Sequence, residues 1–295
     1  MTRLLVTGMN GQVGWELQRS LQCLGDVIAV DRAQFDLAQP DTLTARLEEL
    51  APDVVVNAAA YTAVDKAESE EELATRVNGE SPGVMAAWAA RRGALMLHYS
   101  TDYVFDGAGT VPWLPTDTPA PLSAYGRSKL AGETAVIAAT GDYLILRTSW
   151  VFASRCRNFM LTMLRLAEER EELRVVDDQW GAPTSARLIA DVTAQVIARA
   201  ISERRAGPFR SEVAHLAASG ATTWHAFATA ILDAAKQAGR PVKTKSLVAI
   251  PSSAYPTPAR RPSNSRLDCR SLERRFGLAL PGWERGLRLC IEERE

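Results

Sequence analysis

The sequence predicts an α/β protein with a doubly wound parallel sheet and a smaller C-terminal domain. Apolar runs in the first half show no alternation with polar residues, which is typical of strands buried on both faces. Helical patterns separate these runs, as the crossover connections of a parallel sheet require. With 295 residues, the chain is long enough for one large domain or two coupled domains.

The first 150 residues supply the expected alternation of strands and helices. Strands are expected at residues 4–6, 27–30, 53–56, 94–99 and 143–146. Helices are expected from the glycine turn at 8–14 to near Gly25, from Asp41 as a cap, from Ser81 as N-cap with Pro82 at N1 to Arg92, and over 124–139. These elements make up the predicted sheet and the helices that cover it.

After about Trp150 the alternation fades, and we expect a second domain over 151–295, with later segments returning to the first domain. Helices are expected near 186–204 and 222–238. Two long stretches, 101–123 and 247–266, are rich in Pro, Ser and Thr and are expected to be loops. The prolines of 251–266 favour an extended course.

Composition narrows the classes of function. The chain has 34 Lys and Arg against 35 Asp and Glu, a net charge of -1, which excludes a broad electrostatic footprint for a nucleic-acid polymer or an anionic membrane. Four scattered cysteines and three histidines disfavour a Cys/His metal cage. Because no signal peptide or apolar stretch of about 20 residues is evident, we expect a cytoplasmic protein with free thiols.

A glycine-rich turn joins the first strand to the first helix. Gly8, Gly11 and Gly14 have the spacing G-x-x-G-x-x-G. A dinucleotide pyrophosphate needs backbone N–H groups at close range, which a Cβ would block, and the helix N-terminus adds its positive dipole end. The turn therefore predicts a Rossmann-type dinucleotide site.

Two residues after the second strand bear on the choice of dinucleotide. Asp31 lies about 20 residues after Gly11, where a carboxylate binds the ribose hydroxyls of NAD. Arg32 favours NADP because a guanidinium pairs with a 2′-phosphate. Both cofactors stay open at this point.

A tyrosine and a lysine are spaced for proton transfer. Tyr125 and Lys129 stand four residues apart on a predicted helix, and therefore on one face of it. A lysine beside a phenol is expected to lower the pKa of the tyrosine from about 10 toward neutrality. Such a tyrosine exchanges a proton with a carbonyl or alcohol oxygen while hydride moves at carbon.

Polar residues follow the predicted fourth strand. Ser100, Thr101 and Asp102 come just after its carboxyl end, where open α/β sheets bind ligands. A hydroxyl here can hold the substrate oxygen that Tyr125 protonates.

With these residues, the chain resembles the extended short-chain dehydrogenase/reductases along nearly its whole length. The glycine turn and the Tyr/Lys pair mark that superfamily, and the segments HYSTDYVFDG, DQWGAPT and RPSNSRL are similar to its branch that reduces dTDP-linked 4-keto sugars. The resemblance implies a dinucleotide-binding domain over 1–150 and mainly a sugar-nucleotide-binding domain over 151–295.

The resemblance also implies individual roles. Residues implied to contact the cofactor are Gly11, Gln12 and Val13 at the pyrophosphate, Asp31 at the adenosine ribose, Asp36 and Leu37 at the adenine, Ala60, Tyr61 and Thr62 at its middle, and Tyr99 and Lys129 at its nicotinamide half. Tyr125 would be the proton donor, with Thr101 and Asp102 touching the sugar and Trp150 lining its pocket. Arg260 and Arg261 are candidates for the substrate diphosphate, because guanidinium forks suit phosphate oxygens.

Relatives of this kind have been linked to Mg²⁺ held by glutamates where two subunits meet. Glu16 and Glu292 are weak candidates, but Arg187 stands where a third acid would be expected. A cation beside Mg²⁺ is unfavourable, which makes Mg²⁺ doubtful and leaves a homodimer open.

The implied reaction is reduction of the C4 ketone of dTDP-4-dehydro-L-rhamnose to dTDP-L-rhamnose, with NADPH or alternatively NADH. Another nucleotide-sugar 4-keto reductase, an epimerase of the same fold and a non-catalytic regulatory subunit are the alternatives. Intact Tyr125 and Lys129 disfavour the regulatory subunit.

Overall fold

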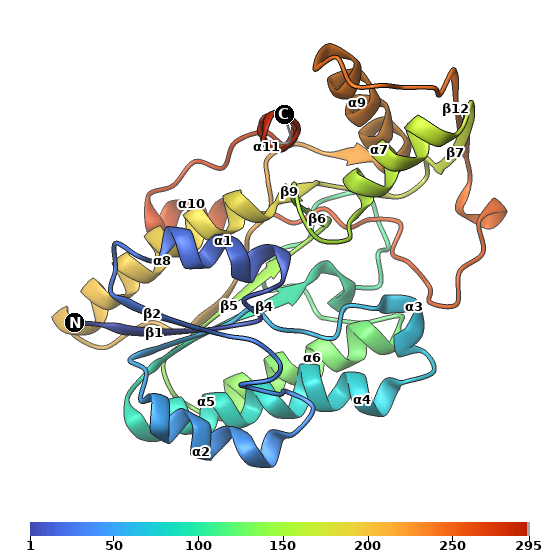
Figure 1. Cartoon of the computed structure of the whole chain (residues 1–295). Helices are drawn as coiled ribbons and strands as arrows, with labels where there is room; N and C mark the ends of the chain where they lie inside the picture. Colours follow the sequence, from blue (N-terminus) through green and yellow to red (C-terminus); the bar gives the residue numbers. More distant parts are fainter. Residues whose placement is uncertain (294–295) are drawn as a thin grey trace.

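A six-stranded sheet forms the centre of the computed structural model, which describes residues 1–293 (Figure 1). Its spatial order is β10-β5-β4-β3-β1-β2, and every neighbouring pair is parallel. The strands are β1 (Arg3–Thr7), β2 (Asp26–Val30), β3 (Val54–Asn57), β4 (Leu95–Thr101), β5 (Tyr143–Thr148) and β10 (Glu212–His215). The strand order reverses between β1 and β3, which creates the crevice where such sheets bind ligands. The predicted doubly wound parallel sheet is confirmed.

Helices cover both faces of this sheet (Figure 1). One face carries α1 (Gln12–Ser20), α8 (Ala186–Ala206) and α10 (Arg270–Phe276), and the other carries α2 (Pro40–Leu50), α5 (Ser81–Arg92) and α6 (Ala124–Ala138). Each layer has its own apolar core: Leu4, Leu17 and Ile189 belong to the first, and Leu5 and Trp88 to the second. Alternate residues of one strand thus enter opposite cores, as the pleat requires.

Three predicted helix boundaries are wrong. Ser81 does not cap α5, because α4 (Glu71–Thr75) and a π-helical turn over Arg76–Glu80 run directly into that helix. The Ser81 hydroxyl instead donates a hydrogen bond to the Leu37 carbonyl, at 2.6 Å. Asp41 lies inside the first turn of α2, which starts at Pro40, and α1 ends at Ser20, well before Gly25.

A second group of elements lies beyond the carboxyl edge of the sheet (Figure 1). Its members are β6 (Val151–Phe152), α7 (Phe159–Glu169), β7 (Glu172–Val176), β8 (Trp180–Gly181), β9 (Thr184–Ser185), β11 (Thr222–Thr223), α9 (Trp224–Gln237), β12 (Ser246–Ile250) and α11 (Trp283–Glu292). Phe152, Met160, Phe227 and Ile231 form its core. The start of the expected 247–266 loop is strand, because β12 pairs with β7.

Three later elements, α8, β10 and α10, lie in the layers of the central sheet (Figure 1). A domain division near residue 150 stays a prediction. Within residues 1–293, none of the helices is both long and apolar enough to cross a membrane.

Candidate active site

The glycine turn lies at the carboxyl end of β1, beside the point where the strand order reverses. Gly8 has φ +73°, and a Cβ there would lie 2.9 Å from the Cα of Ala59. A Cβ on Gly14 would lie 2.1 Å from the Gly8 carbonyl oxygen, so only glycine permits this close strand–helix packing. Gly11 is the N-cap of α1 and offers no side-chain cap, which leaves the first N–H groups of the helix, from Gln12 and Val13 onward, for an anion. The turn fits a dinucleotide pyrophosphate.

The residues after β2 are arranged around a tight turn. Asp31 Oδ1 accepts hydrogen bonds from the backbone N–H groups of Ala33, at 2.9 Å, and Gln34, at 3.2 Å. Arg32 has a side chain that is 79% exposed and lies 3.3 Å from an oxygen of Asp36. Asp31 and Arg32, which were predicted to bind the adenosine ribose or its 2′-phosphate, thus lie at the surface. The Leu37 side chain, by contrast, is buried in the core under α2.

The N-terminus of α6 places Tyr125 and Lys129 against the end of β4. Ser123 caps the helix by accepting the Gly126 N–H at 3.1 Å. A Cβ on Gly126 would lie 2.3 Å from the Tyr103 carbonyl oxygen, so glycine lets α6 approach the segment that follows β4. Lys129, one turn later, is buried and donates to the Tyr99 carbonyl at 2.6 Å.

Tyr125 is a neutral phenol in this arrangement. Burial raises its pKa well above 10, the Asp102 carboxylate raises it further, and a hydrogen bond with the Thr101 hydroxyl partly opposes both effects. The expectation that Lys129 lowers this pKa toward neutrality is wrong. The Lys129 amine is directed to the Tyr99 carbonyl and the His98 ring, so burial determines the pKa of the phenol.

Thr101 and Asp102 meet Tyr125 at the end of β4, which runs two residues further than predicted. The Thr101 hydroxyl donates to Asp102 Oδ1 at 2.9 Å and accepts the Tyr103 N–H at 3.2 Å. Asp102 opens a short 3-10 turn over Asp102–Val104 and is 2% exposed. Burial raises its pKa to about 6, although the hydroxyls of Ser265 and Thr101 oppose that rise. The site therefore holds a phenol, a hydroxyl and a carboxyl group whose pKa is raised to about 6.

The loop after β3 is tied to α6 by a residue that the sequence analysis missed. Asn78, on the π-helical turn, accepts the Tyr61 N–H at 2.8 Å and donates to the Tyr61 carbonyl and to the Ser128 hydroxyl, both at 3.0 Å. The Tyr61 hydroxyl donates to Glu70 at 2.7 Å. Ala60 and Thr62 flank Tyr61 in this loop, at the carboxyl end of the sheet.

Tyr99 and Trp150 are both held firmly. The Tyr99 hydroxyl lies 2.6 Å from the hydroxyl of Thr193 on α8, so the tyrosine ring lies on the opposite side of the sheet from Lys129 and meets that lysine through its carbonyl alone. Trp150 has φ +49° and stacks on Trp224 with ring centroids 3.6 Å apart. This stack connects the end of β5 to the second group of elements.

The two arginines of the Pro-rich loop have different surroundings. Arg261 donates to the Tyr103 hydroxyl at 2.9 Å and to Asp65 Oδ2 at 2.8 Å, whereas Arg260 is exposed. Asp65 lies on α3 (Val64–Ala67), so Arg261 fastens the loop beside the site.

The proposed acidic cluster does not fit Mg²⁺. Glu16 is buried and pairs with Arg19 at 3.3 Å and with Arg187 at 3.7 Å. Arg187 also pairs with Glu293, while Glu292 is an exposed residue at the end of α11. The described part of the chain contains no group of three or more His, Cys, Asp or Glu side chains arranged for a metal.

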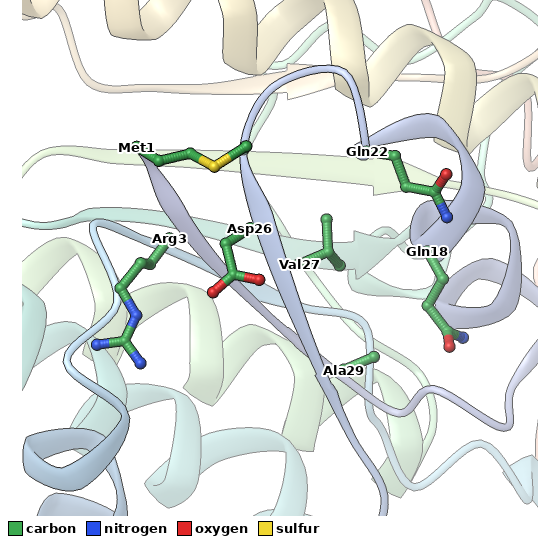
Figure 2. A pocket seen from close by; sticks show the side chains of 8 residues that line it. Met1, Arg3, Gln18, Gln22, Asp26, Val27 and Ala29 are labelled. Carbon is green, nitrogen blue, oxygen red and sulfur yellow. The ribbon is translucent and has the colours of Figure 1, made fainter.

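An open groove of about 630 Å³ lies away from these residues, between α1 and the edge strand β2 (Figure 2). Arg3 of β1, Gln18 of α1, Gln22 of the turn after α1 and Asp26 of β2 line it. The side chains that line this groove do not combine a proton donor with a hydroxyl group, as a site for reducing a ketone would require. The candidate active site is therefore the carboxyl edge of the sheet.

The fold, the glycine turn and the Tyr–Lys helix define a nicotinamide-dependent oxidoreductase of the short-chain dehydrogenase/reductase type. The family model described as RmlD substrate binding domain matches residues 1–295. A dTDP-4-dehydrorhamnose reductase from Burkholderia thailandensis is 54% identical over 99% of this chain and 98% of its own. The chain belongs to the dTDP-4-dehydrorhamnose reductase family, as the resemblance in the sequence predicted.

Solved structures agree with this assignment. A dTDP-4-dehydrorhamnose reductase from Clostridium acetobutylicum is 34% identical and superposes with a TM-score of 0.89 over 99% of both chains. A second one, from Bacillus anthracis in complex with NADP, is 32% identical and has a TM-score of 0.89 over 99% of this chain and 100% of its own.

Proposed function

We propose that this chain reduces the C4 ketone of dTDP-4-dehydro-L-rhamnose to dTDP-L-rhamnose, with Tyr125 as the proton donor. The observation that carries the proposal is the meeting of Tyr125, Thr101 and Asp102 at the carboxyl edge of the sheet, beside the glycine turn. The names of the relatives support the substrate, and the NADP complex of the Bacillus anthracis protein supports the cofactor.

Tyr125 is suited to give a proton to an alkoxide. Its raised pKa keeps the phenol protonated at neutral pH, so the proton is in place before the reaction. As the ketone carbon gains hydride, its oxygen becomes an alkoxide, a stronger base than a phenolate, and takes the proton. A positioned acid of this kind contributes about 10²–10⁴-fold in rate.

Thr101 and Lys129 support that transfer in different ways. The Thr101 hydroxyl lies at the phenol and donates its one proton to Asp102 Oδ1, so turning that proton toward the substrate would let it orient the oxygen that receives the proton of Tyr125. Lys129 lies one helical turn beyond Tyr125, and its positive charge stabilises the phenolate that remains. Asp102 and Trp150 would contact the sugar.

NADPH, when bound, supplies the hydride from its nicotinamide. Gly8, Gly11 and Gly14 would hold its pyrophosphate with the first N–H groups of α1, next to Gln12 and Val13. Arg32 would bind a 2′-phosphate, and Asp31 would bind the ribose of NADH. Residues proposed for the rest of the cofactor are Asp36, Leu37, Ala60, Tyr61, Thr62, Tyr99 and Lys129.

The substrate diphosphate would meet Arg260, which is exposed, with Arg261 next to it in the same loop.

Unpaired thiols on all four cysteines support a cytoplasmic location. A homodimer stays a prediction.

The test is a turnover assay with enzymatically generated dTDP-4-dehydro-L-rhamnose. Oxidation of NADPH and of NADH is followed by absorbance, with EDTA as a control, and the product is identified by NMR. Formation of dTDP-L-rhamnose supports the proposal. Another stereoisomer, epimerisation without net oxidation of cofactor, or cofactor binding without turnover would each contradict it.

A further inference from the structure

A row of buried polar side chains crosses the central sheet beneath the candidate active site. Thr7, Asn57 and His98 are partners in the register of β1, β3 and β4, so their side chains stand side by side on one face. All three are at most 1% exposed. Two residues earlier in these strands, on the same face, stand the apolar side chains of Leu5, Val55 and Met96, so this row is an exception within an apolar core.

The row is continuous and ends at Lys129. The Ala59 N–H donates to Thr7 Oγ1 at 3.1 Å, and the Thr7 hydroxyl donates to Asn57 Oδ1 at 2.7 Å. Asn57 Nδ2 lies 3.0 Å from His98 Nδ1, and His98 Nε2 lies 3.4 Å from Lys129 Nζ. Two backbone-fixed points therefore bound the network: the Ala59 N–H at one end and the Tyr99 carbonyl, which Lys129 contacts, at the other.

The direction of these hydrogen bonds follows from the Ala59 N–H. Thr7 accepts that bond and has one proton to donate, which goes to Asn57 Oδ1. The amide of Asn57 must then present its N–H to His98 Nδ1, because the opposite orientation leaves the buried Thr7 proton without an acceptor in the network. A neutral His98 ring therefore carries its own proton on Nε2, facing Lys129.

An N–H that faces an amine favours the uncharged form of that amine. His98 stays neutral because burial and the nearby lysine hold its pKa well below 6.5. Burial lowers the pKa of Lys129 to about 8, while the Glu133 carboxylate on the same helix raises it. Arg147 of β5 neutralises Glu133 through a buried ion pair, which weakens that opposing effect. Tyr125, one turn earlier on α6, is uncharged.

We propose that His98 is a positioning residue for Lys129, held by Thr7 and Asn57 as the Nε2–H tautomer so that its ring N–H faces the Lys129 amine. The catalytic consequence rests on the proposed function: the protonation state of Lys129 decides whether a positive charge stands one helical turn from the phenolate that Tyr125 becomes. The tautomer and the titration of Lys129 are properties of the unliganded chain.

The experiment reads both properties by NMR on the full chain. Long-range ¹⁵N–¹H spectra report which nitrogen of His98 carries the proton, and the ¹³Cε shift of Lys129 gives its titration midpoint. The Nε2–H form is expected in the unchanged chain. Asn57→Asp replaces the amide by an isosteric carboxylate, which accepts from both Thr7 and the Nδ1–H of His98 and so turns the Nε2 lone pair toward Lys129. The new charge also favours the ammonium by itself, so the uncharged variant Thr7→Val described below separates the two effects. The midpoint should then rise by about one pH unit or more.

A second variant covers the case in which the buried carboxylate prevents folding. Thr7→Val removes the hydroxyl that fixes the amide, so the Nδ1–H form should become populated and the Lys129 midpoint should rise. Thr193→Val is the matched control, because it removes a buried hydroxyl bond on the opposite face of β4 and should lower stability with no change in either reading. The limb of the kcat–pH profile that reports the titration of Lys129 should shift by the same amount as the titration midpoint measured by NMR.

An Nδ1–H tautomer in the unchanged chain, or an unmoved Lys129 midpoint in the folded variants, would overturn the inference. Neither reading needs substrate. A failed turnover assay with the expected spectra would therefore refute the proposed reaction and leave the positioning role intact.

Discussion

Replacement of Lys129 by methionine should stabilise the unliganded protein at neutral pH. The side chain is 3% exposed, and burial lowers its pKa from 10.5 to about 8. Below pH 8 the lysine is charged in both the folded and the unfolded chain, so the folded state bears the full cost of the buried charge. That cost declines as pH rises through the interval between 8 and 10.5, because the folded lysine loses its proton first.

The size of the effect follows from the two pKa values. The fall in the pKa of Lys129 from 10.5 in the unfolded chain to about 8 in the folded one lowers the free energy of unfolding by about 3 kcal/mol at pH 7 and about 2 kcal/mol at pH 9. Lys129→Met also removes the bond to the Tyr99 carbonyl, worth about 1 kcal/mol. We expect the free energy of unfolding of the variant to exceed that of the unchanged chain by about 2 kcal/mol at pH 7. This difference should shrink by about 1 kcal/mol at pH 9.

Urea unfolding without cofactor at pH 7, 8 and 9 measures these differences, since a bound ligand would add its own stabilisation. Lys236→Met, at an exposed lysine of α9, is the matched control and should change stability by less than about 0.5 kcal/mol at each pH. A Lys129 variant that is less stable than the unchanged chain, with a difference that does not vary with pH, would refute the reasoning.

Three further changes test other parts of the structure. Tyr125→Phe should lower kcat by about 10²–10⁴-fold while cofactor binding, measured by fluorescence titration, stays intact; turnover at the normal rate would exclude Tyr125 as the acid. Glu133→Gln leaves the Arg147 guanidinium, 4% exposed, without its carboxylate, and urea unfolding should show a loss of about 3–5 kcal/mol. Because Arg187 already neutralises Glu16, neither Mg²⁺ nor EDTA should change the unfolding temperature, and a clear rise with Mg²⁺ would show that a cation site exists.

The predictions from sequence succeeded where the signal is local. The apolar runs of the parallel strands and the glycine spacing of the first turn are properties of short segments, and both led to the correct sheet. The Ser81-Pro82 step is equally local, yet it failed as a helix start because the preceding segment continues as helix through a π-helical turn. There the packing of Ser81 against Leu37 decided the outcome.

The parts of the site that the sequence analysis missed depend on register between distant segments. Asn57 and His98 are 41 positions apart, and they become neighbours because β3 and β4 pair at that register. The pKa of Tyr125 depends on its burial and on Asp102, neither of which follows from the four-residue spacing to Lys129. Arg261 is a loop residue in the sequence, but its partner Asp65 lies nearly 200 positions earlier.

Two ionisable groups and two buried polar atoms at the carboxyl edge of the sheet are in unfavourable states. Lys129 and Asp102 are both held away from their ordinary pKa values, and among the described residues Ser100 Oγ and Asp102 Oδ2 have no hydrogen-bond partner. Each feature costs stability, which hydrogen bonds such as those of Thr101 to Asp102 and of Lys129 to the Tyr99 carbonyl offset only in part. A ligand hydroxyl placed against Asp102 could donate to the unpartnered Oδ2, so this feature, which weakens the unliganded fold, favours the bound one.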